Sequence, residues 1–245
     1  IDSKKLIVFG DYASQPSRSV FAFCKLAKVP HEVKEVRVLF NEQYGKDYKK
    51  VNANSKVPAI QDHILLNNKI EVLQLSESHN IMRYLVQSRG LVDHWYPQDP
   101  FKRAKVDEYL DWHHSNIRQG SGIFFYRRYV YPSVKGKPFA PILLKQVELM
   151  QERALNFIES YFLKEDQPFM FGAQPTIADV SCACEMAHFL PWTRDLEQEG
   201  FKKTKKWLDR MLALPEMKEI HDKAIPMLKA LVENVHSNER DGPKL

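Results

Sequence analysis

The chain has 245 residues, 44% of them hydrophobic and 27% charged, which is the mixture of an ordinary globular protein and excludes a disordered chain. No apolar run approaches the ~18 residues that a membrane span needs, so we expect no membrane partner. The formal net charge of +5 is only weak support for nucleic-acid binding, and the densest basic cluster, residues 202–206, favours a solvated helix end over an anion-binding patch, so we expect no nucleic-acid partner.

The first ninety residues alternate strand and helix patterns. Short apolar or alternating runs predict strands, and apolar residues at helical spacing predict helices. The expected strands cover residues 5–10, 31–39, 56–61 and 69–75, and the expected helices cover 17–27, 45–52 and 76–86. This β-α-β-α-β-β-α order predicts a compact α/β domain over residues 1–89.

Beyond this domain the pattern becomes almost entirely helical. Residues 90–100 carry two prolines and are interpreted as a linker. Residues 101–245 are expected to form an all-helical domain, with helices over 101–117, 141–163, 176–189, 201–212 and 216 to about 235.

A turn at residues 11–16 separates the first strand from the first helix. A helix N-terminus offers free N–H groups and the positive end of the helix dipole, and both favour an anion. A hydroxyl from Ser14 or Ser17 either caps this helix or donates a hydrogen bond to a bound anion. No G-x-S-x-G sequence accompanies these serines, so a serine hydrolase is not indicated.

Pro58 interrupts the third expected strand. Proline cannot donate to a central strand ladder, so it fits either an edge strand or a cis peptide bond. Either arrangement leaves the N–H and C=O of Val57 free to pair with a peptide-like ligand by strand addition. An ordinary edge strand without a ligand is the alternative.

Two serines and a glutamate stand at the start of the third expected helix. Ser76 or Ser78 is a plausible cap, and a first-turn carboxylate suits the helix dipole. The functional alternative is a clamp for an α-amino-acid terminus. In that clamp Glu77 holds the ammonium group, while the Ser78 hydroxyl and the helix N–H groups hold the carboxylate.

Several polar residues of the helical half admit a structural or a functional interpretation. Thr176 and Asp179 fit a capping box, which we interpret as a folding signal. His113 and His114 are adjacent and diverge by ~100° around a helix, and no further ligand motif completes a metal site. Arg118 either forms a surface salt bridge or turns towards an anion in the groove between the two domains.

The three cysteines, Cys24, Cys182 and Cys184, are an odd number and include no C-x-x-C motif. These features argue against a disulfide framework and against zinc, and they favour a reducing compartment. We therefore expect three buried thiols, no metal and a cytoplasmic protein.

The order of these motifs resembles the cytosolic glutathione transferases, and most closely their theta class, over about residues 5–225. The matching stretches are Ser14-Gln15-Pro16-Ser17-Arg18, Asn52-x-x-x-Lys56-Val57-Pro58, Glu77-Ser78-x-x-Ile81, Asp93-His94-Trp95-Tyr96-Pro97 and Val106-x-Glu108-Tyr109-Leu110-x-Trp112. The resemblance implies an α+β protein, in which an N-terminal thioredoxin-like α/β domain precedes an all-α helical domain. It also implies a homodimer.

The resemblance further implies a detoxification enzyme that ionises the thiol of its co-substrate glutathione beside Ser14. The thiolate would be conjugated to a small hydrophobic electrophile, such as an alkyl halide or epoxide, or would reduce hydroperoxides, with no permanently bound cofactor. The implied glutathione-binding residues are Ser14, Gln43, Tyr44, Lys56, Val57, Pro58, Glu77 and Ser78. The implied walls of the electrophile pocket are Tyr109, His113, Arg118 and Phe124.

The sequence departs from the theta pattern at Gln43 and Tyr44, where relatives carry a His-Lys pair for the glycyl carboxylate. The departure predicts weaker or altered glutathione binding. It leaves open a non-catalytic ligand-binding or scaffold protein with the same fold. Tyr12 is an alternative activating hydroxyl, but the Ser-x-Pro-x-Arg spacing follows Ser14.

The last three residues, Pro243-Lys244-Leu245, approximate the Ser-Lys-Leu peroxisomal address. A chance tripeptide is the alternative.

Overall fold

Four strands form one sheet in the N-terminal part of the chain. The computed structural model describes residues 5–67, 69–164, 167–188 and 194–240. The strands are β1 (Leu6–Gly10), β2 (Glu32–Glu35), β3 (Ala59–Leu66) and β4 (Lys69–Ser76), in the spatial order β2-β1-β3-β4. β1 runs parallel to β2 and antiparallel to β3, and β3 and β4 form an antiparallel hairpin.

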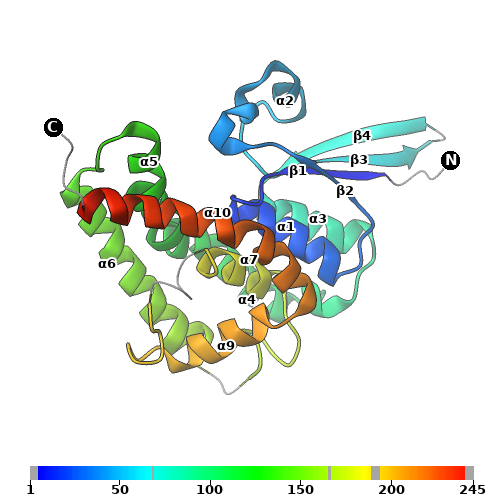
Figure 1. The fold of residues 1–245 in the computed structure, drawn as a ribbon. Helices are drawn as coiled ribbons and strands as arrows, with labels where there is room; N and C mark the ends of the chain where they lie inside the picture. Colours follow the sequence, from blue (N-terminus) through cyan, green and yellow to red (C-terminus); the bar gives the residue numbers. More distant parts are fainter. Residues whose placement is uncertain (1–4, 68, 165–166, 189–193, 241–245) are drawn as a thin grey trace.

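The two faces of this sheet are covered by different helices, as Figure 1 shows. Side chains alternate along a strand, so Leu6 and Val8 of β1 point into the large core with α1 (Gln15–Leu26) and α3 (Ser78–Ser88). Ile7 and Phe9 point the other way and pack with Tyr48, which lies on α2 (Lys46–Val51). The sheet is therefore the middle layer of three.

Beyond α3 the regular elements of the described chain are all helices. They are η3 (Asp93–Trp95), α4 (Pro100–Ser115), η4 (Gln119–Ile123), η5 (Tyr126–Val130), α5 (Tyr131–Lys135), α6 (Pro141–Phe157), η6 (Ile158–Phe162), α7 (Ile177–Met186), α9 (Lys202–Leu212) and α10 (Pro215–Arg240). This arrangement confirms the predicted fold class, a thioredoxin-like domain followed by an all-helical domain. None of the described helices combines the length and the apolar character that crossing a bilayer requires.

Several element boundaries differ from the sequence-based prediction. The strand expected over residues 31–39 ends at Glu35, and the chain turns into η1 (Val38–Phe40) because the Asp11 carboxylate accepts a hydrogen bond from Val38 N at 2.7 Å. β3 begins at Ala59, after Pro58, and not at residue 56, and it ends at Leu66 and not at residue 61. The helix expected over residues 141–163 divides into α6 and the wider turn η6.

The helical run from η4 to α5 was not predicted from the sequence. Two glycines interrupt the apolar periodicity there, and one of them is required by packing. A Cβ on Gly120 would lie 2.3 Å from Gln151 Cα, so only glycine allows η4 to approach α6 this closely. The side-chain amide of Gln151 donates to Gly120 O at 2.6 Å and fixes the contact.

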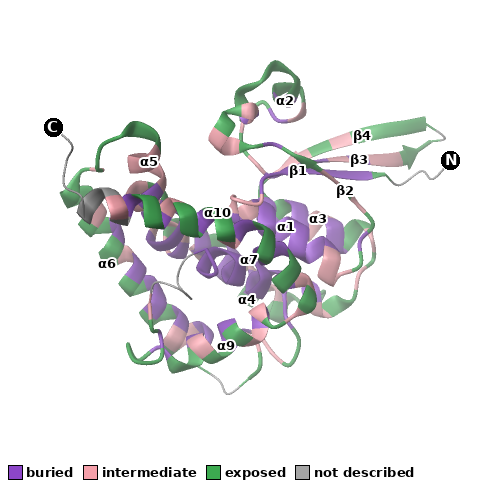
Figure 2. Cartoon of the chain, viewed as in Figure 1, coloured by how far each residue is buried: buried purple, intermediate pink, exposed green. Residues whose placement is uncertain are grey.

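Helix α1 lies in the middle of the molecule, between the sheet and helices α7 and α10. Its residues from Ser17 to Cys24 are buried, and Figure 2 shows the purple of α1 continuing into α7. The fully buried guanidinium of Arg18 joins these helices by donating to Cys184 O at 3.2 Å and by contacting His188 Nδ1 at 2.9 Å. Burial lowers the pKa of Arg18 to about 10, so the group stays charged at neutral pH.

The predicted capping box starts helix α7. The Thr176 hydroxyl accepts from Ala178 N at 3.2 Å, and the Asp179 carboxylate accepts from Thr176 N at 2.9 Å. The other oxygen of Asp179 accepts from Met170 N and from Trp207 Nε1, both at 2.9 Å. One buried carboxylate therefore joins the loop before α7 to helix α9.

Replacing Thr176 by alanine should lower the free energy of unfolding by about 1 kcal/mol, because the first turn of α7 loses its cap. Urea unfolding of the variant and the wild type measures this loss. Gln174→Ala, an exposed position in the same loop, is the control and should leave stability unchanged. Equal losses in both variants would mean that the loop, and not the cap, sets the stability.

Candidate functional site

A cleft of about 180 Å³ lies where the two halves of the chain meet. The N-terminal half contributes the start of α1, the turn before β3 and the start of α3. The helical half contributes the end of α4, the following turn and one face of α7. The lining residues are Pro16, Ser19, Asn52, Lys56, Val57, Pro58, Ser76, Glu77, Ser78, His113, His114, Arg118, Ser181 and Glu185.

Ser14 is the N-cap residue of α1, and its Oγ accepts from Ser17 N at 3.4 Å. The first turn of α1 carries no acidic residue, so the positive end of the helix dipole is not offset there. Ser14 is half-buried and is not among the lining residues of the cleft, although Pro16 and Ser19 of the same helix are. Its hydroxyl thus lies at the helix N-terminus beside the cleft.

Tyr12, the alternative hydroxyl, faces the C-terminal helix. Lys223 Nζ of α10 donates to the Tyr12 hydroxyl at 3.2 Å and lies 4.9 Å from the centre of its ring. The tyrosine ring also packs on Phe21, 5.0 Å away between centroids. Tyr12 is therefore engaged in packing α1 against α10.

The turn before β3 is held from one side by two donors. The Tyr48 hydroxyl and Asn52 Nδ2 donate to Lys56 O, at 2.6 and 2.8 Å. The Val57–Pro58 bond is cis, one of the two arrangements considered for the sequence. Among the described residues no backbone hydrogen bond uses Val57, so its N–H and C=O are available to a ligand in the cleft.

Glu77 is the N-cap residue of α3, and neither neighbouring serine caps the helix, so that structural expectation was wrong. The backbone of Glu77 has φ 71°, a left-handed value that side-chain-bearing residues adopt at a cost. Ser78 becomes the first residue of the helix and is buried, while Glu77 is exposed. Both residues line the cleft, with a carboxylate and a hydroxyl beside free helix N–H groups.

Gln43 and Tyr44 do not line the cleft. Both lie in the short turn η2 (Glu42–Tyr44), where Gln43 is buried and Tyr44 is 59% exposed. Within the described part of the chain, Gln43 Oε1 has no hydrogen-bond partner. Among the lining residues of the N-terminal half, Lys56 is the one cation.

Glu185 of α7 is the buried anion of the cleft, and it was not predicted from the sequence. Arg118 Nη1 donates to one of its oxygens at 2.9 Å, and Gly122 N donates to the other at 2.8 Å. Burial opposes its charge, but the attraction of Arg118 and the contact with His113 outweigh it and lower the pKa of Glu185 to about 2. Arg118 thus lines the cleft with its direction fixed by a buried partner.

Three imidazoles gather beside this ion pair. The ring centroid of His79 lies 4.8 Å from that of His113 and 4.6 Å from that of His114. His79 Nε2 lies 2.6 Å from the hydroxyl of Ser181, and His113 Nε2 lies 3.5 Å from Glu185. Burial lowers the pKa of His79 and of His113, so both rings are neutral at neutral pH.

Two of the four residues expected to wall an electrophile pocket line the cleft, namely His113 and Arg118. Tyr109 is fully buried, because it follows Val106 on the core face of α4, and its hydroxyl lies 3.1 Å from His113 Nδ1. Phe124 is also buried, at 8% exposure. Ser181, His114 and Glu185 line the cleft in addition. Of these, His114 was considered only as a metal ligand, and the one sequence signal for Glu185 is an acidic residue within the apolar helix α7.

The three cysteines are buried and free, which agrees with the sequence-based interpretation. Burial raises the pKa of Cys24 and of Cys184 to about 12, and it also raises that of Cys182. No described group of histidine, cysteine and acidic residues has the arrangement of a metal site.

Comparison with protein families gives two matches. Residues 13–88 match the model of the glutathione S-transferase N-terminal domain, and residues 124–215 match that of the C-terminal domain. Glutathione S-transferase T1 of Arabidopsis thaliana is 33% identical over 226 residues, covering 89% of this chain and 88% of that protein. Human glutathione S-transferase theta-1 is 31% identical over 183 residues, covering 75% of this chain and 72% of that protein.

Two further relatives are much longer than this chain. Glutathione S-transferases T2 and T3 of Arabidopsis thaliana are 34% and 33% identical, and the chain spans 36% and 37% of their lengths. Among solved structures, human glutathione transferase theta-2 in complex with glutathione has a TM-score of 0.81 at 29% identity. That similarity covers 94% of this chain and 91% of the other, and so includes both halves of the fold.

Proposed function

Since the chain belongs to the theta class of the glutathione S-transferase family, we propose that it binds reduced glutathione in the cleft and conjugates it, through its sulfur, to a small hydrophobic electrophile. The observation that carries the proposal is the meeting of Lys56, Val57, Pro58, Glu77 and Ser78 in one cleft. These residues come from separate segments, and together they offer a strand-like backbone, a carboxylate, a hydroxyl and a cation. Those are the groups that a γ-glutamyl peptide requires.

In this proposal the γ-glutamyl end of glutathione lies at the start of α3. Glu77 accepts from the ammonium group, and the Ser78 hydroxyl and the free N–H groups of the helix donate to the carboxylate. The cysteinyl backbone pairs with Val57 as an added strand. Lys56 faces the glycyl carboxylate.

The reaction begins with loss of the thiol proton to solvent. A free thiol has a pKa of about 8.5, so only a few per cent is ionised at neutral pH. We propose that the Ser14 hydroxyl donates a hydrogen bond to the sulfur and that the N-terminus of α1 attracts its negative charge. The thiolate then attacks the electrophilic carbon, so that a C–S bond forms as the bond to the leaving group breaks.

Calorimetric titration of reduced glutathione and of S-hexylglutathione tests the binding step. Glu77→Gln should raise the dissociation constant about tenfold or more, because the ammonium group loses its charged acceptor. Glu71→Gln is the control, since this exposed glutamate lies on β4 and does not line the cleft. A panel of alkyl halides, epoxides and hydroperoxides then identifies the electrophile.

A second function is favoured by Gln43 and Tyr44, which supply no cation and do not line the cleft. In that case the fold serves as a ligand-binding or scaffold protein with little catalysis. Absence of heat at millimolar glutathione, together with stoichiometric binding of an apolar ligand, would overturn the transferase proposal in favour of this one.

We propose a homodimer in which the outer half of the β3–β4 hairpin is buried. In the part of the chain that the structure describes, β1 pairs with β3 from Ala59 to Asp62, and His63 N donates to Lys5 O, while β3 and β4 stay paired out to Leu66 and Lys69, so the end of the hairpin extends beyond β1. Leu65, Ile70 and Val72 lie on one face of it, and they are 54%, 52% and 48% exposed. An apolar face of this kind on an edge strand favours a protein partner.

Val72→Asp should convert the dimer to a monomer, because the charge would be buried without a partner. Light scattering after gel filtration measures the mass. Leu66→Asp places the same charge on the opposite face of the hairpin, where Leu66 pairs with Lys69, and it should leave the dimer intact. A wild-type monomer at micromolar concentration would contradict the proposal.

We propose that the enzyme serves detoxification in the cytoplasm. The peroxisomal alternative rests on Pro243-Lys244-Leu245, which lie outside the described residues.

A further inference from the structure

The backbone carbonyl of Lys56 is bound by two side chains, one of which lies outside the cleft. The Tyr48 hydroxyl donates to Lys56 O at 2.6 Å, and Asn52 Nδ2 donates to the same oxygen at 2.8 Å. Asn52 lines the cleft, whereas Tyr48 does not. A carbonyl oxygen has two lone pairs, so the two donors together use both of them and fix the direction of the C=O bond.

Tyr48 reaches this carbonyl from a rigid position on the outer face of the sheet. The residue is 7% exposed, and its ring packs on Phe9 with the centroids 6.1 Å apart. Burial raises the pKa of Tyr48 to about 12, so the hydroxyl is a protonated donor at neutral pH. Helix α2 is itself tied to β4, because Gln74 Nε2 donates to Lys50 O at 3.0 Å. The hydroxyl is therefore held in place on both sides of the ring that carries it.

The peptide group between Lys56 and Val57 carries this orientation into the cleft. The bond is trans, and the C=O and N–H of a planar trans peptide point in opposite directions. The N–H of Val57 therefore points away from Tyr48. Val57 lines the cleft, and among the described residues no backbone hydrogen bond uses its N–H. Two donors on one side of the peptide group thus aim an unused donor on the other side.

The same two hydrogen bonds also strengthen the N–H as a donor. A donor on the carbonyl oxygen draws electron density towards that oxygen and leaves the amide hydrogen of the same peptide group more positive. A ligand that finds the N–H already oriented also loses less conformational freedom on binding. Both effects favour a ligand with a backbone carbonyl opposite Val57.

We propose that Tyr48 is a positioning residue for glutathione, acting through the peptide group of Lys56 and Val57 without touching the ligand. The inference rests on the proposed function, in which Val57 pairs with the cysteinyl backbone. It extends the binding machinery to α2, which contributes no lining residue to the cleft. Because Val57 binds the backbone and not the sulfur, the role of Tyr48 concerns the affinity for glutathione and not the reactivity of the bound thiolate.

Tyr48→Phe is the test, because it keeps the ring against Phe9 and removes only the hydroxyl. Calorimetric titration should show dissociation constants for reduced glutathione and S-hexylglutathione that are about threefold to tenfold higher than in the wild type. With an electrophile that the wild type turns over, KM for glutathione should rise by the same factor. The value of kcat at saturating glutathione should stay within about twofold of the wild type.

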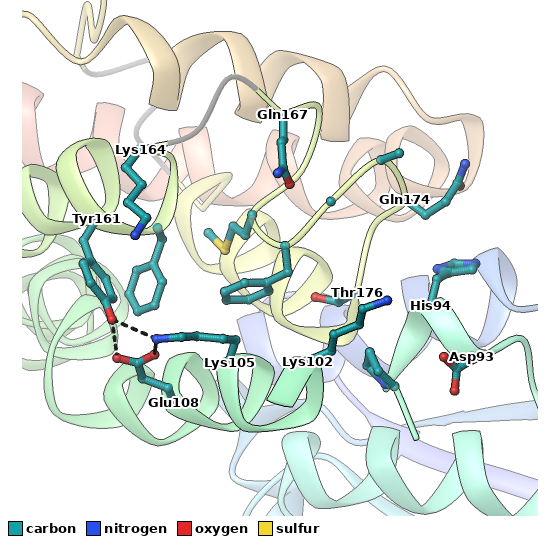
Figure 3. A pocket seen from close by; sticks show the side chains of 16 residues that line it. Asp93, His94, Lys102, Lys105, Glu108, Tyr161, Lys164, Gln167, Gln174 and Thr176 are labelled. Atoms are coloured by element: carbon teal, nitrogen blue, oxygen red, sulfur yellow. Dashed lines mark hydrogen bonds and ion pairs between the residues drawn. The ribbon is translucent and has the colours of Figure 1, made fainter. Parts of the chain in front are cut away.

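Two other tyrosines provide matched controls. Tyr96 is also 7% exposed, and its hydroxyl donates to Asp107 at 3.0 Å away from the cleft. The Tyr161 hydroxyl donates to Glu108 at 2.7 Å in the wall of a separate cavity of about 500 Å³, which shares no lining residue with the cleft (Figure 3). Tyr96→Phe and Tyr161→Phe each lose a comparable hydrogen bond and should keep the wild-type affinity. The thermal midpoints verify that all three variants are folded.

NMR relaxation of the backbone amides reads the positioning step without any ligand. The order parameter of the Val57 N–H should fall in Tyr48→Phe and stay unchanged in Tyr96→Phe. Wild-type affinity in Tyr48→Phe would overturn the proposal, and so would a fall in kcat with an unchanged KM, or an equal loss of affinity in the controls. A wild type that binds no glutathione would instead contradict the proposed function. In that case an unchanged order parameter of Val57 would still show that Tyr48 does not orient this peptide group.

Discussion

Replacing Ser14 by alanine is expected to lower kcat/KM for conjugation by about 10- to 100-fold, since one hydrogen bond to a charged group is worth about 1.5–3 kcal/mol. Ser14 stands at the N-terminus of α1, where the helix dipole already favours a negative sulfur. The pH at which bound glutathione is half ionised should rise by about one to two units. Ultraviolet difference spectra of the bound thiolate measure that shift without any electrophile.

Two further variants test whether the effect belongs to the Ser14 hydroxyl and not to a neighbouring one. Ser17→Ala removes a buried hydroxyl that has no hydrogen-bond partner among the described residues, so its rate should equal that of the wild type. Tyr12→Phe removes the alternative hydroxyl, which contacts Lys223. Full activity of Ser14→Ala together with a large loss in Tyr12→Phe would transfer the role from the serine to the tyrosine.

Substituting Glu185 by glutamine should lower the free energy of unfolding by about 3 kcal/mol at neutral pH. The carboxylate is fully buried, and the substitution leaves the guanidinium of Arg118 without its counter-charge. The pKa of Glu185 falls from 4.5 to about 2 in the folded protein. A lowered pKa in the folded state means that this stability is present above pH 4.5 and is lost as the pH falls towards about 2.

Urea unfolding at several pH values between these limits provides the measurement. The difference between wild type and Glu185→Gln should be largest above pH 4.5 and should shrink steadily as the solution is acidified. Glu152→Gln is the matched control, because Glu152 also pairs with an arginine, Arg194, but is 50% exposed. Exposed pairs contribute little, so this control should change stability by less than about 1 kcal/mol at any pH. A constant difference for Glu185→Gln across the range would mean that its charge is not the source of the stability.

Local signals in the sequence were sufficient to predict much of the fold and the side of the cleft that the N-terminal half contributes. The capping box of Thr176 and Asp179, the proline at position 58 and the acidic residue before Ser78 each act on residues near to them in the chain. Hydrophobic periodicity predicted β1 and α1, because it too depends on residues that are close together in the chain. Such features depend on neighbours within a few positions, so one sequence contains all that is needed to recognise them.

The helical side of the cleft depends on contacts between distant residues, and the sequence did not reveal them. Arg118 and Glu185 are 67 positions apart, and nothing in either local pattern pairs them. Tyr109 was expected at a pocket wall, but the face of α4 on which it lies is set by packing against α7. The turn from Val36 to Phe40 likewise follows from the distant carboxylate of Asp11 and not from its own alternating valines.

The central position of α1 has a consequence for exchanging parts between related proteins. The helix belongs by sequence to the N-terminal half, yet one of its sides packs on α7 and α10 of the other half. A hybrid joined in the linker would therefore place α1 from one parent against α7 and α10 from the other. Arg18 would then face whatever residue the second parent has in place of His188. Recombination in this fold is constrained by complementary shape across that surface more than by the point at which the chains are joined.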